Sequence, residues 1–241
     1  GEHTALETVV FAVSLLENNP LFNAGLGSQI QSDGKIRMSA SIMDGPTRRF
    51  SGVINIESVK NAVQVAAKLL AEDDRVLGGE GALAFARKAG FEFYNPELPQ
   101  RRTEFEAKLA SQGLGTVGCV AIDANGKLAA ATSTGGKGFE LPGRISDSAT
   151  TAGNYANETC GISCTGVGED IVSVALASNI ATRVKDGFAI DQAFGKSFAE
   201  LLPFDGFAGA IGIDIQGNIF HQDSHPSMVY AHFDGETLAC F

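Results

Sequence analysis

Residues 113–123 read Gly-Leu-Gly-Thr-Val-Gly-Cys-Val-Ala-Ile-Asp, and residues 127–136 read Lys-Leu-Ala-Ala-Ala-Thr-Ser-Thr-Gly-Gly. Between them stands Asn125-Gly126, a dipeptide that favours a tight turn between two strands. Apolar residues dominate both runs, and glycines bound them on the outside. We therefore predict a β-hairpin whose strands cover 117–123 and 127–133, and we expect the rest of the chain to be organised around it.

Thr116 stands at the head of the first predicted strand, directly behind Gly115. A threonine hydroxyl is a weak nucleophile unless a base lies beside it. If the chain were cut before Thr116, the freed α-amine, with a pKa of about 8, could accept the proton of its own side chain. The alternative is a threonine that merely starts a strand, which is common.

The remaining pattern alternates between helices and hairpins. Apolar residues at helical spacing predict helices, and alternation with Gly-containing turns predicts hairpins. Residues 92–113 are polar and contain prolines, and we expect them to be the least structured part. Antiparallel strands with paired helices favour sheets covered by helix layers. The predicted helices are 5–16, 57–72, 80–89, 169–186 and 190–201, and the predicted strands are a hairpin within 28–43, one strand at 159–164, a hairpin of 208–215 with 218–222, and two short strands at the end.

Composition excludes several functional classes. The 241 residues are 44% hydrophobic and 19% charged, which suits a large core. The net charge of −10 argues against nucleic acid as a partner, because phosphate binding needs clustered Lys and Arg. No apolar run reaches the length of a membrane helix, and no secretory signal is recognisable at the start. The four cysteines are expected to be free thiols, which suits a reducing, cytoplasmic location.

Two further pairs carry chemistry. Arg144 and Asp147 follow a Gly-rich loop, where a guanidinium would suit a carboxylate and a carboxylate would suit an ammonium. Together they could hold an α-amino acid head group, or they could form a salt bridge on the surface. Thr165-Gly166 ends an apolar run, where a hydroxyl and a backbone N–H could form an oxyanion hole. The alternative for this pair is a helix N-cap followed by a turn.

The order of these motifs resembles the plant-type asparaginase/isoaspartyl peptidase family over essentially the whole chain. The family's usual first strand, which ends in His-Gly-Gly, has no counterpart here. The resemblance rests on Pro20-Leu21-Phe22-Asn23-Ala24-Gly25-Leu26-Gly27, Ala40-Ser41-Ile42-Met43-Asp44-Gly45, Gly115-Thr116-Val117-Gly118-Cys119, Ala131-Thr132-Ser133-Thr134-Gly135-Gly136, Leu141-Pro142-Gly143-Arg144-Ile145-Ser146-Asp147 and Ser163-Cys164-Thr165-Gly166-Val167-Gly168-Glu169.

This resemblance implies a fold and a maturation step. The family has the N-terminal nucleophile hydrolase fold, an α+β, four-layer αββα sandwich with antiparallel sheets between helix layers. We accordingly expect one domain over 1–241 that lacks the first strand. It would cut itself between Gly115 and Thr116 into an α subunit, 1–115, and a β subunit, 116–241, and two αβ units would pair as a dimer.

The resemblance also implies roles for individual residues. The nucleophile maps to Thr116, and the threonine that hydrogen-bonds it maps to Thr134. The partners of the substrate carboxylate and amine map to Arg144 and Asp147. The remaining implied roles are an oxyanion hole at Thr165 and Gly166, a site-facing amide at Asn23, and carbonyl ligands for a structural Na⁺ (or K⁺) at Leu16, Glu17, Asn19, Phe22, Ala24 and Leu26.

The predicted activity is that of an amidohydrolase with no organic cofactor. Its small-molecule substrates would be L-Asn, β-aspartyl dipeptides, or both. The alternatives are a glycosylasparaginase that cleaves the Asn–sugar linkage, and a non-catalytic relative that only binds amino acids. Ser146-Asp147-Ser148-Ala149 departs from the family's Gly-Asp-Ser-Pro, and we expect this to affect substrate preference more than reaction type.

Overall fold

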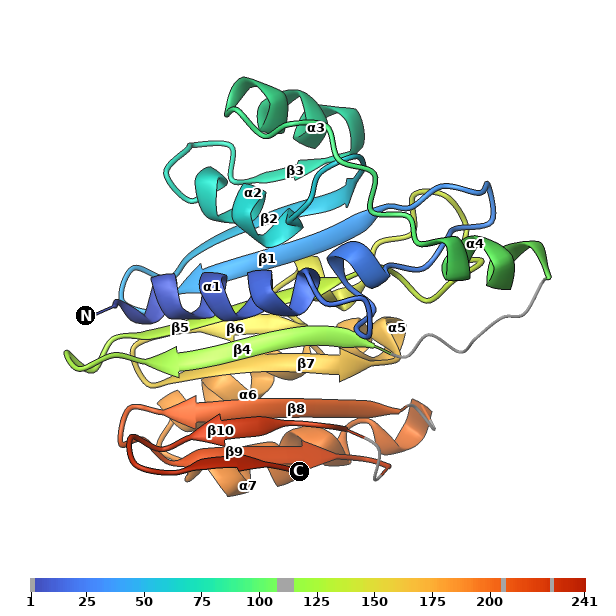
Figure 1. Cartoon of the computed structure of the whole chain (residues 1–241). Helices are drawn as coiled ribbons and strands as arrows, with labels where there is room; N and C mark the ends of the chain where they lie inside the picture. The colour runs from blue at the N-terminus through green and yellow to red at the C-terminus, as the bar shows by residue number, and fades with distance from the viewer. Residues whose placement is uncertain (1–2, 108–114, 205–206, 226–227) are drawn as a thin grey trace.

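Two β-sheets form the centre of the molecule in a computed structural model that describes residues 3–107, 115–204, 207–225 and 228–241 (Figure 1). The first sheet has the strand order β3-β2-β1-β5-β4, and the second has the order β6-β7-β8-β9. A separate two-stranded sheet pairs β10 with β11. The strands are β1 (Met38–Asp44), β2 (Arg49–Ile56), β3 (Val76–Gly78), β4 (Thr116–Ile122), β5 (Leu128–Thr134), β6 (Asn154–Ala156), β7 (Cys160–Gly166), β8 (Ala208–Asp214), β9 (Ile219–Asp223), β10 (Ala231–Phe233) and β11 (Leu238–Cys240).

Helices cover the outer face of each main sheet. α1 and α2 pack on the five-stranded sheet, whereas α6 and α7 pack on the four-stranded sheet. The chain is therefore the predicted α+β sandwich with αββα layers. The helices are α1 (Ala5–Glu17), α2 (Ala62–Leu69), α3 (Gly79–Lys88), α4 (Pro99–Glu106), α5 (Gly168–Ser173), α6 (Leu176–Lys185) and α7 (Ile190–Ala199), with short 3₁₀ turns η1 (Gly25–Gly27), η2 (Asp147–Ala149) and η3 (Leu202–Phe204).

Alternation along the strands separates the layers. On β4 and β5, Val117, Ala129 and Ala131 join the core beneath α1 and α2. Their neighbour Ala130 joins instead a small cluster between the sheets with Met43. Because successive side chains of a strand point to opposite faces, one hairpin serves both the helix-covered core and the space between the sheets.

The predicted central hairpin is confirmed. β4 pairs antiparallel with β5 from Thr116 opposite Thr134 to Ile122 opposite Leu128. A Cβ atom added at Gly118 would lie 2.0 Å from Oγ of Ser163 on β7. The two sheets therefore approach so closely at this point that β4 needs a glycine there.

Two predictions about the first half of the chain are wrong. Residues 28–37 form a turn, with Gln31 N–H donating to the Lys35 carbonyl at 2.9 Å, but they form no strand before β1. The described part of 92–113 contains the helix α4, which begins at Pro99 and buries none of its residues. A helix without a buried face leaves no hydrophobic period in the sequence, so the pattern could not reveal it.

Two further predictions are wrong: one continuous helix over 169–186, and only antiparallel pairing between strands. The helix expected over 169–186 breaks at Ala175, whose φ of 48° is left-handed. The result is two helices, α5 and α6, instead of one. In the first sheet β3 pairs with β2 in parallel, although the sequence pattern predicts only antiparallel pairing.

None of the helices in the described part of the chain is long and apolar enough to cross a membrane.

Candidate active site

Three hydroxyl residues form a row across one end of the five-stranded sheet. Thr116 on β4 pairs with Thr134 on β5, and Thr134 pairs on its other side with Ser39 on β1. Thr116 shares its face of β4 with Gly118, which approaches the second sheet. The two threonines therefore face the space between the sheets, where Thr116 is half-buried and Thr134 is buried.

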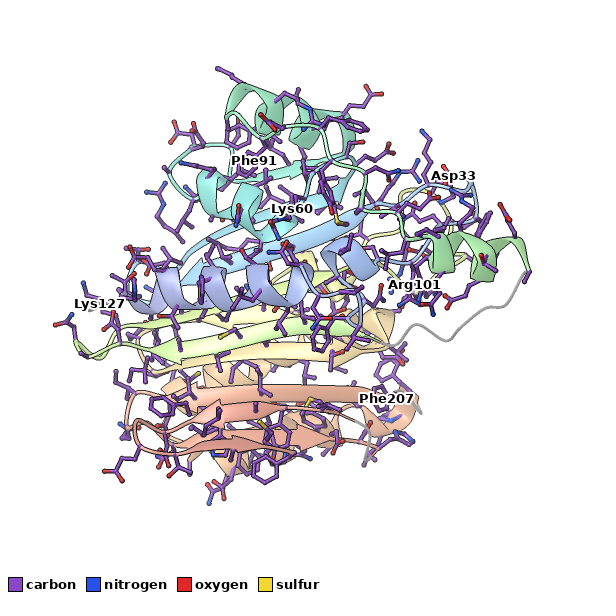
Figure 2. The ribbon with its side chains drawn as sticks, viewed as in Figure 1. Asp33, Lys60, Phe91, Arg101, Lys127 and Phe207 are labelled. Carbon is purple, nitrogen blue, oxygen red and sulfur yellow. The ribbon has the colours of Figure 1, made fainter. Side chains whose placement is uncertain are left out.

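Thr165 lies at the same end of this space. β4 and β7 run in opposite directions, as Figure 1 shows, and Gly118 of β4 lies against Ser163 of β7. Thr116 lies two residues before Gly118 on β4, and Thr165 lies two residues after Ser163 on β7. Because the two strands run in opposite directions, both threonines lie on the same side of the Gly118–Ser163 contact. In Figure 2, the label of Phe207 marks this end of the second sheet, and Lys127 lies at the opposite end of the first sheet.

The backbone at Gly166 requires glycine. Its φ is +132°, and an added Cβ would lie 2.2 Å from the Phe207 carbonyl oxygen. The N–H of Val167 donates to that same carbonyl at 2.7 Å. The N-cap of α5 is Val167, which makes no side-chain capping bond, so the alternative of Thr165 as a helix cap is wrong.

Asn23 lies beside the predicted cleavage site. A Cβ added at Gly115 would lie 3.0 Å from the Asn23 Cβ. The Asn23 side chain donates from Nδ2 to the Gly136 carbonyl and accepts at Oδ1 from Gln29 N–H at 3.2 Å. Its main-chain carbonyl accepts from Gly135 N–H at 2.8 Å. These bonds join the Asn23 loop to the Gly-rich segment that follows β5.

Thr134 is tied to this same segment. Its Oγ1 accepts a hydrogen bond from Gly136 N–H at 3.3 Å. Gly136 has a φ of +86°, and an added Cβ would lie 2.0 Å from Oε1 of the buried Glu140. The turn after β5 therefore depends on glycine, and it holds the Thr134 hydroxyl at the end of the sheet.

Arg144 forms a two-pronged ion pair with Glu169 of α5. Nε donates to Oε1 at 2.9 Å, and Nη2 donates to Oε2 at 2.8 Å. The guanidinium lowers the pKa of the Glu169 carboxyl to about 2. The sequence alone does not reveal this partner, because Glu169 has the pattern of an ordinary acidic residue in the first turn of a helix. The alternative of a surface salt bridge between Arg144 and Asp147 is therefore wrong, because Arg144 pairs with Glu169 and Asp147 is buried.

Asp147 is buried at the start of η2, which packs against β1, β5 and β7. Within the described part of the chain, its Oδ2 has no hydrogen-bond partner. Burial raises the pKa of this carboxyl to about 7, although the positive charge of Arg144 acts in the opposite direction. A Cβ added at Gly168 would lie 2.8 Å from Asp147 Oδ1 and 3.0 Å from Arg144 Nη2. A positive and a negative group thus converge at the start of α5.

Carbonyl oxygens converge on the predicted cation loop. An added Cβ at Gly25 would lie 2.3 Å from the Glu17 carbonyl oxygen, and one at Gly27 would lie 1.9 Å from that of Phe22. Two of the predicted carbonyl ligands, those of Glu17 and Phe22, therefore lie against η1, whereas the carbonyls of Leu16, Asn19 and Ala24 accept hydrogen bonds from Asn19, Phe22 and Gly27 N–H within the loop. The Glu17 carboxylate points elsewhere, because it accepts from Ser133 Oγ at 2.6 Å and from Val63 N–H at 3.0 Å.

This architecture defines a class of protein. Two sheets between helix layers, with a threonine opening a strand at the end where polar groups converge, are the architecture of a hydrolase of the N-terminal nucleophile type. The family model described as asparaginase matches residues 1–240. The chain belongs to this asparaginase family.

Curated relatives agree with this assignment. The isoaspartyl peptidase/L-asparaginase of Synechocystis is 45% identical over 98% of this chain and 77% of its own length. The plant-type L-asparaginase of Thermococcus kodakarensis is 37% identical over 95% of this chain and 83% of its own length. The isoaspartyl peptidase of Escherichia coli is 37% identical over 90% of this chain and 74% of its own length.

Proposed function

We propose that this hydrolase cleaves the side-chain amide of L-Asn and the isopeptide bond of β-aspartyl dipeptides, with Thr116 as the nucleophile. The observation that carries the proposal is the position of Thr116, which opens β4 opposite Thr134 at the end of the sheet. The names of the relatives favour these substrates over the Asn–sugar linkage of a glycosylasparaginase. A non-catalytic relative would have no need of the row of hydroxyls.

Maturation is the first step of the proposal. While Gly115 is attached, the nitrogen of Thr116 is an amide and cannot serve as a base. Attack of the Thr116 hydroxyl on the Gly115 carbonyl would break the peptide bond and form an ester. Water would then hydrolyse that ester, which leaves a carboxylate on Gly115 and a free amine on Thr116. Asn23, whose Cβ lies against Gly115, would orient the carbonyl that is attacked.

The same hydroxyl would then act on substrate. The free α-amine takes the proton of Thr116 as its oxygen attacks the substrate amide carbon, and Thr134 orients that oxygen. The Thr165 hydroxyl and the Gly166 N–H would stabilise the negative charge on the tetrahedral intermediate. Ammonia or an amino acid leaves with the proton, and water releases aspartate from the ester.

The head group of the substrate would be held by opposite charges. The Arg144 guanidinium suits the α-carboxylate, and it can offer this contact if the carboxylate replaces or shares the place of Glu169. The Oδ2 atom of Asp147, which has no partner among the described residues, suits the α-ammonium group. A buried carboxylate oxygen that lacks a hydrogen bond is costly, and a bound ammonium would remove that cost.

Three further features belong to the proposal. Carbonyls of the 16–26 loop would hold a Na⁺ or K⁺ ion, which would stiffen the loop that carries Asn23. Two αβ units would associate as a dimer. The four cysteines, none of which forms a disulfide in the described chain, suit the reducing environment of the cytoplasm.

Mass spectrometry of the purified, incubated protein tests the proposal. We expect two chains, 1–115 and 116–241, together with release of aspartate from L-Asn and from β-Asp-Leu. Thr116→Ala should remain one chain and lose at least about 10⁴-fold in activity, because the nucleophile is gone. Thr8→Ala, the same change at an exposed position of α1, is the matched control and should behave as the wild type does. An intact wild-type chain that releases no aspartate from either substrate contradicts the proposal.

A further inference from the structure

Asn55, near the end of β2, lies in a β-bulge. Met38 pairs with Ile56 and Ala40 pairs with Val53, so that Ser39 on β1 stands opposite two residues of β2. Asn55 is the second of these two residues and has a left-handed φ of 53°. Bulges change the direction of a side chain, and asparagine is one of the few residues other than glycine that tolerates this conformation.

Three hydrogen bonds connect Asn55 to three different segments. Its main-chain N–H donates to Ser39 Oγ at 3.1 Å. Its Nδ2 donates to the main-chain carbonyl of Arg144 at 3.0 Å, and its Oδ1 accepts from Gln31 Nε2 at 3.3 Å. Ser39 belongs to the row that contains Thr134 and Thr116. Asn55 therefore joins the row of the proposed nucleophile directly to the backbone of the proposed carboxylate-binding residue.

The loop that carries Arg144 has little packing of its own. Leu141 is 78% exposed and Ile145 is 54% exposed. Pro142, Gly143 and Ile145 of this loop line a cavity of about 570 Å³ that Asn55 also lines. Because the loop borders open space here, a hydrogen bond to the Arg144 carbonyl is an effective way to fix its position.

We propose that Asn55 is a positioning residue for substrate binding, which sets the place of Arg144 relative to Thr116. The inference rests on the function proposed above and extends it to a residue outside the site. Loss of the bond from Nδ2 lets the Arg144 loop shift, so that the guanidinium meets the substrate α-carboxylate less well. Self-cleavage at Gly115 should be unaffected, because that step uses no substrate head group.

Two variants separate the side-chain bond from the backbone conformation. Asn55→Asp tolerates the left-handed conformation and keeps the acceptor for Gln31, but it cannot donate to the Arg144 carbonyl. Asn55→Gly also tolerates the conformation and removes both side-chain bonds. Asn125→Asp makes the same chemical change in the exposed turn at the far end of the β4–β5 hairpin, and it serves as the matched control.

The measurements are kcat and KM for L-Asn and β-Asp-Leu, the Kd of L-aspartate by calorimetry, the fraction processed and the melting temperature. For Asn55→Asp and Asn55→Gly we expect KM and Kd to rise about 5- to 10-fold, the size of one lost hydrogen bond, with kcat within about twofold of the wild type. Processing should be complete, and Asn125→Asp should match the wild type.

Unchanged KM and Kd in both Asn55 variants overturn the inference, and so does a fall in melting temperature with no change in KM, which would mark a purely structural role. If the wild type releases no aspartate, the proposed function fails, but the Kd of L-aspartate still decides the role of Asn55. A wild type that neither turns over substrate nor binds L-aspartate overturns both.

Discussion

Asp147, the proposed partner of the substrate ammonium, shows how burial changes the ionisation of a single carboxyl. Its pKa is raised to about 7, from an ordinary value of 3.8, because it lies out of water. A raised pKa means that the uncharged form is favoured until the pH reaches about 7. Pairing with a substrate ammonium needs the charged form, so binding at this residue is coupled to pH.

We predict that the affinity for L-aspartate falls as the pH is lowered from about 8 to about 5.5. Protonation of Asp147 near pH 7 removes the charge that is proposed to face the α-ammonium, while the α-carboxylate of the ligand stays ionised across this range. Calorimetric titration at several pH values measures the effect. In Asp147→Asn, which keeps the shape but cannot ionise, binding should be weak and nearly independent of pH, and a pH profile equal to that of the wild type would contradict the prediction.

At the scale of single residues, the sequence shows which residue types stand in the candidate site motifs and in what order, but not which side chains meet. Thr116, Thr134 and Asn23 could be proposed as site residues from the sequence, because they stand in short motifs whose order resembles one family. Glu169 and Asn55 could not be connected to Arg144, because they are 25 and 89 residues away from it in sequence. Only the packing of α5 and β2 around the Arg144 loop brings the three together.

At the scale of the elements, contact between two strands controls the distance between the sheets. At Gly118 an added Cβ would lie 2.0 Å from Ser163 Oγ and 2.9 Å from its Cβ. The Ser163 hydroxyl in turn shares a hydrogen bond of 2.7 Å with Thr132 Oγ1 on β5. β4, β5 and β7 therefore meet through small and hydroxyl side chains at Gly118, two residues along β4 from the proposed nucleophile Thr116.

We predict that Gly118→Ala lowers the free energy of unfolding by about 1–3 kcal/mol, because the added methyl group overpacks the space between β4 and β7. Denaturant unfolding in the unprocessed Thr116→Ala background isolates this effect from maturation. Adding Ser163→Gly removes the atoms that clash, so the double variant should recover part of the loss. A Gly118→Ala protein as stable as its parent would show that the sheets do not meet in this way. So would a double variant whose loss in free energy of unfolding exceeds the sum of the losses in the two single variants.

Secondary elements were predictable where one face is apolar. α1 and the β4–β5 hairpin were predicted correctly, since their buried residues recur at helical or alternating spacing. α4 escapes such prediction, because it is held by Arg101 donating to the Gly27 carbonyl at 3.1 Å and by Phe105 stacked on Phe139 at 5.0 Å between ring centres. Contacts of this kind with distant loops leave no local period; Figure 2 labels Arg101 on this helix.

On the scale of the whole molecule, the proposed cleavage divides a chain whose halves share one sheet. β1, β2 and β3 precede Gly115, whereas β4 and β5 follow it, and the two groups meet where β1 pairs with β5. They also share a core, since Val9 and Val13 of α1 belong to the same apolar cluster as Val117 and Ala131.

We therefore predict that the processed protein remains a single particle under native conditions. Separation would expose this shared core and the edges of β1 and β5, which is far more costly than the loss of one peptide bond's connectivity. Size-exclusion chromatography should show the two chains eluting together, and denaturing electrophoresis should separate them. The intact Thr116→Ala protein provides the reference elution volume, and two separate native peaks for the processed wild type would contradict the prediction.

By itself the sequence determined the kind of chemistry and the layered fold. It did so because hydroxyl, glycine and charged residues stand in short ordered motifs that resemble one family, and because burial on one face leaves a period in elements such as α1 and the β4–β5 hairpin. Only the tertiary structure decided which distant groups meet. Glu169 pairs with Arg144, Asn55 donates to the Arg144 carbonyl, and Gly118 lies against Ser163. These contacts join segments whose spacing in sequence is arbitrary, so their geometry follows from how the sheets and loops pack and not from any local pattern.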